Sequence, residues 1–442
     1  MNHRVAIWVR LRACVESISR VSAAAALCLL ALLAVGCGAG DGSEPVGEVG
    51  ENLTFPPVSF PATSATVDVT LPPLQIADRQ NLTAGAKTSL SLNDRTTTTG
   101  SLASGGPTNG TNDLSIANLT STGKITLGAR AHTGVLRSGG TVVVGTGSST
   151  GTIFQNQSLP ATSAVRFPVT IPAATQSVTA ATNEVATLAP GSYGALIVNS
   201  GAKLTLTSGT FYFRSFDLEP TAQLVIPSGG VTIFVTGAVI YRGSINDGGN
   251  ATRLRFFTFG TAQVRADAPF RGSLVASNGP LSLIAGTHTG FFYGTTLTDD
   301  PSVTFTSTSE ALSRIAPALV GTGVTFTATQ GSAFNGLVAN FTDGNQSDTA
   351  ARFGATINWG DGTAPTAGVV GGAAGSFTIS GTHTYASSGD FNVSVSLLNN
   401  VTGVTATITS TAHVVPNVSV TGVTFTATQG TPFNGLVANV TD

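Results

Sequence analysis

The stretch Leu204–Phe213, with the sequence LTLTSGTFYF, decides the fold. Two short runs of alternating side chains flank a Ser-Gly pair, which is the pattern of half-buried strands joined by a turn. Similar runs of three to five residues recur every seven to ten residues from Leu188 to Tyr293, separated by Gly, Ser, Pro or Asn. A sandwich would have longer strands and hairpin turns. Such short runs predict instead a coiled parallel ladder with ~20–25 residues per turn.

Four segments of this region carry a family resemblance. They are LAPGSYG at Leu188–Gly194, the stretch Leu204–Phe213, FRGSLVA at Phe270–Ala276 and AGTHTG at 285–290. Together they resemble a β-helical domain of bacterial secreted proteins that has no known function and sometimes accompanies pilus-assembly proteins. The resemblance implies an all-β fold with a right-handed parallel β-helix over 188–312, and it implies no activity.

The residues before this region are less regular. Strand-like runs such as Thr66–Thr70 and Thr141–Val144 define a β-rich region over 65–187, in which the β-helix could already begin. Residues 37–64 contain small polar residues followed by Pro56, Pro57 and Pro61, and this composition predicts a flexible spacer that stiffens toward its end.

A long repeat dominates the remainder of the chain. The segment Gly323–Asp343 returns as Gly422–Asp442, with 18 of 21 positions identical and an offset of 99 residues. That period suits one immunoglobulin-like domain. The second copy, within 420–442, stops before any tryptophan strand of its own. We therefore expect a truncated array with poorly ordered final residues.

Between the two copies lies a second family signature. It consists of Trp359, Gly360, Asp361 and Gly362, followed by His383 and Tyr385. These residues resemble the PKD family of Ig-like extracellular domains. The resemblance implies a β-sandwich over 313–419, with the Trp359 ring in the core and a tight turn at Gly360–Gly362.

The first 37 residues predict the location. Four arginines precede the apolar run Val21–Val35, and small residues lead to Cys37. The run is shorter than the ~20 residues of a spanning helix and is typical of a secretory signal. Ending at Cys37, it resembles a bacterial lipobox, although Ala34 stands where leucine is preferred. The resemblance implies a signal peptide over 1–36, lipidation (palmitate) of Cys37 and, because Gly38 rather than aspartate follows, the outer membrane or cell surface. An ordinary secretory signal with an incidental cysteine is the alternative.

Composition narrows the function classes. Removing residues 1–36 takes away four arginines and one glutamate, which leaves 16 basic and 21 acidic residues and a net charge of −5. This balance argues against a nucleic-acid partner. Cys14 and Cys28 leave with the signal, so Cys37 has no intrachain disulfide partner and a cysteine-type zinc site is excluded.

Evidence for catalysis is thin. A carbohydrate-active β-helix would need a carboxylate pair, and the candidates are Asp299, Asp300 and Asp267, with Arg265 and Arg271 nearby. Pro301 favours a turn at the Asp299-Asp300 pair. The histidines are scattered without metal-ligand spacing: His132, His288, His383 and His413. Aspartates that could contact calcium, but more simply form turns, are Asp343, Asp348 and Asp361.

Two further features concern binding. Aromatic residues on both faces of strands such as Phe211–Phe213 and Phe291–Tyr293 could stack on sugar rings. Thr-x-Thr patterns occur at Thr205/Thr207, Thr304/Thr306 and Thr325/Thr327/Thr329. They fit the solvent-exposed positions of alternating strands. Ice or crystal-surface binding would require one flat threonine face across several turns.

The sequence therefore predicts a non-catalytic, cofactor-free surface lipoprotein, anchored in the membrane by lipid, for structural display or adhesion to a glycan or a surface protein. One alternative is a polysaccharide lyase or hydrolase with PKD spacers. The second alternative is ice or crystal-surface binding by threonine ladders.

Overall fold

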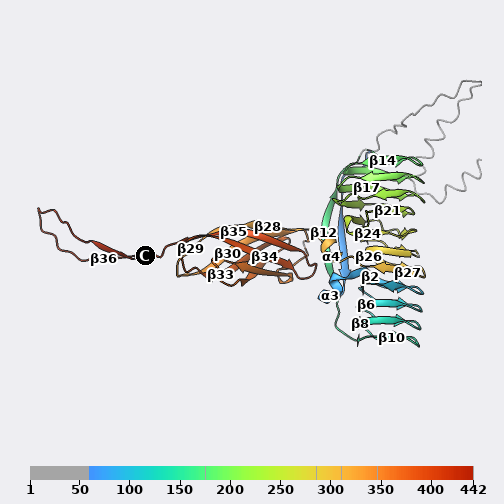
Figure 1. Ribbon diagram of the computed structural model, residues 1–442, viewed down its shortest axis with the longest axis horizontal. Helices are drawn as coiled ribbons and strands as arrows, with labels where there is room; N and C mark the ends of the chain where they lie inside the picture. The colour runs from blue at the N-terminus through green and yellow to red at the C-terminus, as the bar shows by residue number, and fades with distance from the viewer. Residues whose placement is uncertain (1–58, 175, 285, 310, 346, 442) are drawn as a thin grey trace, which may run out of the picture. The chain divides into compact units, whose positions relative to one another are not determined.

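The computed structural model describes residues 59–441, apart from 175, 285, 310 and 346. The predicted signal peptide, Cys37 and most of the predicted spacer lie outside these residues. With 58% strand and 4% helix the chain is all-β, and its largest element is a parallel β-solenoid of about 12 turns (Figure 1). None of the helices in the described part of the chain is long and apolar enough to cross a membrane.

The chain enters the solenoid in its middle. After β1 (Thr63–Leu71) and α3 (Ile76–Gln80), strand β2 (Leu82–Leu92) begins a series of parallel turns. This first half runs through β3 (Thr97–Thr98), β4 (Ser101–Ser104), β5 (Thr108–Gly110), β6 (Ser115–Ser121), β7 (Ile125–Leu127), β8 (His132–Ser138), β9 (Val142–Val144), β10 (Ser149–Thr150) and β11 (Ile153–Phe154).

Strand β12 (Thr162–Ile171) then carries the chain to the opposite end. It pairs antiparallel with β1, with a register shift between Val69 and Thr70. We call this two-stranded ribbon the strap. It runs along the side of the stacked turns (Figure 1).

The second half winds back toward the middle, again with parallel pairing. Its elements are β13 (Val178–Ala180), β14 (Val185–Leu188), β15 (Gly191–Val198), β16 (Lys203–Leu206), β17 (Gly209–Leu218), β18 (Gln223–Val225), β19 (Val231–Val235), β20 (Val239–Tyr241), β21 (Ser244–Asn246), the 3-10 helix Ala251–Arg253, β22 (Leu254–Thr258), β23 (Val264–Ala266), β24 (Arg271–Ala276), β25 (Leu281–Leu283), β26 (Gly286–Asp299) and β27 (Val303–Thr306).

The two halves meet at a seam. Strand β2 pairs with β4 on one side and with β26 on the other, where Ala84 lies beside Phe292 and Leu90 beside Leu297. Strand β27 pairs with β3 in the same way. Each half alone would expose an edge strand here, and pairing at the seam removes both edges. Strands from both predicted regions, 65–187 and 188–312, share this 21-stranded sheet, whereas β14, β16, β18 and β21 form a four-stranded sheet of their own.

Alternating side chains explain the core. Inward positions stack in register from turn to turn, as with Leu281, Leu297 and Leu90, which are fully buried. Outward positions on one face form a second apolar layer beneath the strap and α4 (Ala311–Ile315), which includes Phe234, Phe257 and Tyr293. The Tyr293 hydroxyl accepts a hydrogen bond from the backbone N–H of Thr70, at 2.8 Å, and so fixes the strap to this face.

After α4 the chain forms an eight-stranded domain. Its sheet order is β28-β30-β33-β32-β31-β34-β35-β29, antiparallel except for the β29–β35 pair. The strands are β28 (Leu319–Gly323), β29 (Thr325–Thr329), β30 (Ala333–Asp343), β31 (Phe353–Asn358), β32 (Thr366–Ala373), β33 (Ser376–Thr384), β34 (Gly389–Asn399) and β35 (Thr405–Val415), with a 3-10 turn at Ala350–Arg352. They enclose a separate core that contains Trp359.

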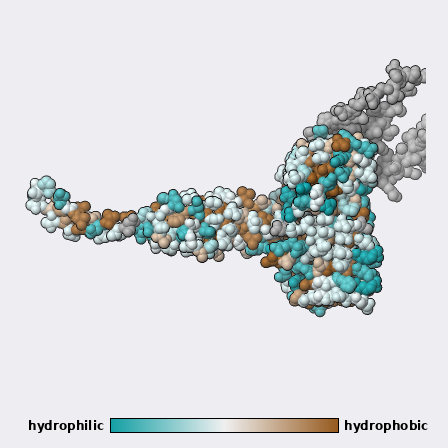
Figure 2. Space-filling model, viewed as in Figure 1, coloured by the Kyte–Doolittle hydropathy of each residue, from teal (hydrophilic) through white to brown (hydrophobic). Residues whose placement is uncertain are grey.

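The second copy of the repeat forms only a hairpin, β36 (Ser419–Gly422) with β37 (Ala438–Thr441). Its apolar side chains are exposed, as the brown patches along it show (Figure 2). Val437 is 55% exposed, whereas Val338, its equivalent in the first copy, is fully buried. The same sequence therefore packs only where the rest of the eight-stranded domain covers it.

Replacing a ladder residue at the seam should destabilise the fold. We expect Leu297→Ala to lower the free energy of unfolding by about 2–5 kcal/mol, because a fully buried leucine leaves a cavity. Ile240→Ala removes an outward side chain that is 39% exposed, and should change it by less than about 0.5 kcal/mol. Denaturant titration followed by circular dichroism measures both; equal effects would contradict the assigned register.

Candidate functional site

Asp299 lies at the seam and points inward. It ends β26 beside Leu283 of β25, in an otherwise mostly aliphatic ladder, and is 2% exposed. Its Oδ1 accepts a hydrogen bond from the Asn93 backbone N–H at 2.6 Å, and its Oδ2 accepts one from the Thr96 hydroxyl at 2.8 Å. The Asn93 side-chain amide donates to the Asp299 carbonyl oxygen. The carboxyl group therefore joins the end of the second half to the start of the first.

Burial dominates the electrostatics of this group. Desolvation raises the pKa of Asp299 to about 7, although the hydrogen bonds from Asn93 and Thr96 oppose the shift. A carboxyl group with such a pKa could transfer protons. However, its side chain is enclosed by the core, and both oxygens already accept hydrogen bonds from the protein. Its geometry is that of a structural group.

The other predicted acidic residues do not join Asp299. Asp267 and Asp300 both contact the Arg265 guanidinium, Asp300 at 3.3 Å, on the exposed side of the solenoid. The hydrogen bond to Asp267 raises the pKa of Arg265. Arg271 instead binds the buried Asp247, with Nε 3.0 Å from each carboxylate oxygen. The sequence candidates are therefore separated, with the Asp299 side chain buried in the core and Asp267 and Asp300 paired with Arg265 on the exposed side.

The tryptophan signature of the eight-stranded domain comes together in one cluster. The rings of Trp359 and His383 stack with centroids 4.7 Å apart, and His383 Nε2 lies 2.7 Å from Asp361 Oδ2. Tyr385 donates its hydroxyl hydrogen bond to the Trp359 carbonyl. Burial opposes ionisation of Asp361, but hydrogen bonds from Thr363 and His383 outweigh it and lower its pKa. Gly360 and Gly362 both have positive φ, as a tight turn requires.

The remaining histidines are far from one another. His288 is buried, where its Nδ1 accepts from the Phe270 N–H and its Nε2 faces the Ile284 carbonyl; burial lowers its pKa. His413 contacts Asp390 on the surface, and His132 is an exposed rung of the solenoid. No group of three or more His, Cys, Asp or Glu side chains with metal-binding geometry occurs within the described ranges.

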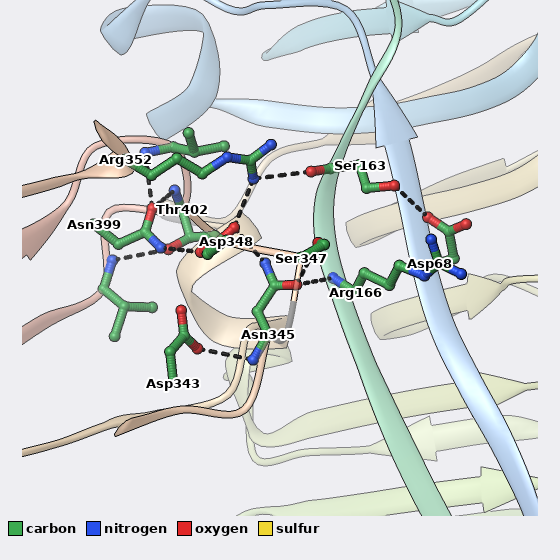
Figure 3. A network of polar contacts seen from close by, with 12 residues as sticks. Asp68, Ser163, Arg166, Asp343, Asn345, Ser347, Asp348, Arg352, Asn399 and Thr402 are labelled. Carbon is green, nitrogen blue, oxygen red and sulfur yellow. Dashed lines mark hydrogen bonds and ion pairs between the residues drawn. The ribbon is translucent and has the colours of Figure 1, made fainter. Parts of the chain in front are cut away.

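A buried polar network links the eight-stranded domain to the strap (Figure 3). Arg352 donates both to Asp348 at 2.7 Å and to the carbonyl of Ser163 in β12 at 2.9 Å. Asn345 accepts from the backbone N–H of Arg166 in β12 at 3.0 Å and donates to Asp348. Because Asp348 is almost fully buried and well paired, removing one partner would be costly.

Asp343 borders this network but is less well satisfied. One carboxylate oxygen accepts from the Asn345 N–H, whereas the other is buried without a hydrogen-bond partner. Desolvation, together with the nearby Asp348, raises the pKa of Asp343 to about 7. The oxygens of Asp348 already accept from Arg352, Asn345 and Asn399. The arrangement therefore offers a cation few free oxygen atoms, and the turn interpretation of these aspartates fits it better than a calcium site.

The aromatic residues expected to reach sugars are covered. Phe257 and Tyr293 point outward from the turns but are buried beneath the strap, and Phe167 of the strap packs edge-on against Phe257. The Thr-x-Thr patterns also separate. Thr205 stacks between Thr187 and Val225, and the pattern Thr325–Thr329 pairs with β35 in the eight-stranded domain, whereas Thr304 lies between two further threonines of the solenoid.

Sequence reasoning missed the residues that complete this last ladder, Thr97 and Thr287. They lie 190 positions apart and become neighbours of Thr304 only through the seam. No signal within either segment indicates that pairing. Comparison of the chain with family models, curated proteins and solved structures finds no match.

The seam carboxyl group should make stability depend on pH. Because the folded-state pKa of Asp299 is about 7, against an ordinary value of 3.8, its contribution is fully present below about pH 4 and is lost as the pH rises through 7. Asp299→Asn should reduce this loss of stability with rising pH. Part of the loss should remain, because the pKa of Asp343 is raised in the same direction. Denaturation midpoints measured from pH 4 to 8 test this. An identical decline in the variant would exclude Asp299 as its source.

Proposed function

We propose that the protein is a non-catalytic lipoprotein of the bacterial cell surface, and that its solenoid and eight-stranded domain display a surface for adhesion to a glycan or another protein. The observation that carries the proposal is the burial and ion pairing of the candidate carboxylates. Asp299 is buried in the seam, and Asp267 and Asp300 share one arginine. This arrangement favours a scaffold over the lyase or hydrolase alternative.

The finer assignments belong to the same proposal. We assign the eight-stranded domain to the PKD-type Ig-like sandwiches, and the stacked Trp359–His383 pair with its Asp361 contact supports this assignment. We assign the solenoid to the right-handed parallel β-helices, on the resemblance of the region Leu188–Val303. Lipidation of Cys37 would supply the membrane anchor, and the residues between it and the strap would serve as a spacer.

A binding screen tests the adhesive role. The purified chain is applied to a glycan array, and each ligand that binds is then assayed for cleavage. We expect binding without turnover, and binding that survives the double variant Asp267→Asn/Asp300→Asn. Cleavage that this variant abolishes would overturn the proposal in favour of a carbohydrate-active enzyme, because those two carboxylates are the exposed members of the acidic set.

The anchor has its own test. Cys37→Ala should move the protein from the membrane fraction to the soluble fraction and abolish labelling by a palmitate analogue, because one thiol carries the lipid. A chain with Cys14→Ala serves as the control, since that cysteine lies within the predicted signal. Membrane association and labelling that persist in Cys37→Ala would contradict lipidation at this residue.

A further inference from the structure

One face of the solenoid carries a ladder of polar side chains across six turns, five of them Thr or Ser and one of them His132. Parallel pairing places Thr287, Thr304, Thr97, Ser115, His132 and Ser149 in one column. The Thr304–Thr97 pair joins β27 to β3 across the seam. Every member is exposed or half-buried, so the column faces solvent.

A second column runs beside the first, two residues further along each strand. It contains Thr289, Thr306 and Thr99, and then Ala117, Gly134 and Gly151, with a register shift between Thr99 and Ala117 because 97–101 is one residue longer than 115–118. Thr289 pairs directly with Thr306, and Thr99 follows Thr98, which pairs with Phe305. Three consecutive turns therefore present a complete Thr-x-Thr pattern, and the next three present Ser115 with Ala117, His132 with Gly134 and Ser149 with Gly151. We call these twelve residues the hydroxyl face.

The hydroxyl face carries no acidic, lysine or arginine side chain, and its first column is regular. Stacked strands set a spacing of about 4.8 Å along each column and of about 6.6 Å between columns. Small threonine, serine, alanine and glycine side chains leave the surface level, with only His132 projecting from it. Each threonine offers a methyl group and a hydroxyl that can donate and accept, although the Thr99 hydroxyl already accepts a hydrogen bond from the Ser307 backbone N–H. Such an array can hold a layer of ordered water at a fixed repeat.

A second ladder of the same solenoid, exposed or half-buried except at the buried Ser282, differs in composition, and we call it the second exposed ladder. On that side the column runs through Ile197, Asp217, Ile240, Arg265 and Ser282, and then through Thr298, Ser91, Asn109, Thr126 and Val143. From Ile197 to Arg265 it mixes opposite charges with branched aliphatic side chains, whereas from Ser282 to Thr126 it is uncharged. A flat periodic ligand would meet steps and charges between Ile197 and Arg265, and the hydroxyl face differs from the rest of this ladder in its three consecutive Thr-x-Thr pairs.

We propose that the hydroxyl face binds the surface of ice. A ligand for it must be extended, uncharged, rich in hydroxyl groups and periodic on the scale of the strand spacing, and a lattice of water molecules has these properties. His132 is the only one of the twelve residues with a ring on which a sugar could stack, so a polysaccharide fits the face less well. This activity goes beyond adhesion to a glycan or protein, and it uses a surface that the adhesion screen does not presuppose.

The test is inhibition of ice recrystallisation by the purified chain, together with adsorption of the fluorescently labelled chain to a growing ice crystal. Thr304→Tyr and Thr97→Lys each place a bulky side chain in the middle of the hydroxyl face. Thr126→Lys makes a matched change in the second exposed ladder, where Thr126 pairs with Asn109. Circular dichroism and the melting temperature show whether each variant retains the wild-type fold.

We expect the wild-type chain and Thr126→Lys to inhibit recrystallisation and adsorb to ice, and both activities to be lost in folded Thr304→Tyr and Thr97→Lys. An inactive wild-type chain would overturn the proposal, as would an active Thr304→Tyr. Adsorption of the wild-type chain to cellulose or chitin but not to ice, if Thr304→Tyr abolished it, would reassign the face to a polysaccharide. A failed ice assay leaves the glycan-array result unaffected, so the two proposals fail separately.

Discussion

Parallel pairing between β2 and β26 is the constraint on which the rest of the structure depends. The chain winds one set of turns away from the middle of the solenoid, crosses back along the strap and winds a second set toward the middle. Each set alone would end in an unpaired strand edge, which is a site of aggregation. The seam converts both edges into internal hydrogen-bonded rungs. It also brings together residues about 200 positions apart, such as Asn93 and Asp299.

The strap follows from the same topology. Because the second half starts at the far end, a segment must run across the turns, and β12 does so in partnership with β1. This ribbon covers the face on which Phe257 and Tyr293 point outward, so those aromatics stabilise the fold instead of meeting a ligand. The strap also carries Ser163 and Arg166, to which the eight-stranded domain is hydrogen-bonded. One return strand thus completes the second core layer and supports the neighbouring domain.

Sequence patterns within short segments predicted the features that depend on short segments alone, namely the strands and the tight turn after Trp359. Alternation of period two identified the strands from Leu188 onward because the core lies on one side of each, and the tryptophan signature predicted a buried Trp359 followed by a glycine turn. The order of the turns could not be predicted, since any alternating strand can stack on any other. Asp299 illustrates the limit. Pro301 predicted a turn at Asp299-Asp300, but the turn begins at Pro301. Asp299 still belongs to strand β26, and the register of that strand directs its side chain into the core. The hydroxyl face was missed for the same reason, because Thr97 and Thr304 meet only through the seam.

Hydrogen–deuterium exchange on the native chain tests the seam most directly. If β2 and β26 are central rungs, their amides should exchange through the most global opening of the solenoid, and therefore more slowly than those of the terminal strands β10 and β13. Protection in β2 and β26 at least equal to that of other internal rungs would agree with the proposed winding. Exchange in β2 as fast as in β10 would mean that the two halves do not join there. That result would contradict the positions assigned to the strap, the buried Asp299 and the hydroxyl face, because all three depend on this pairing.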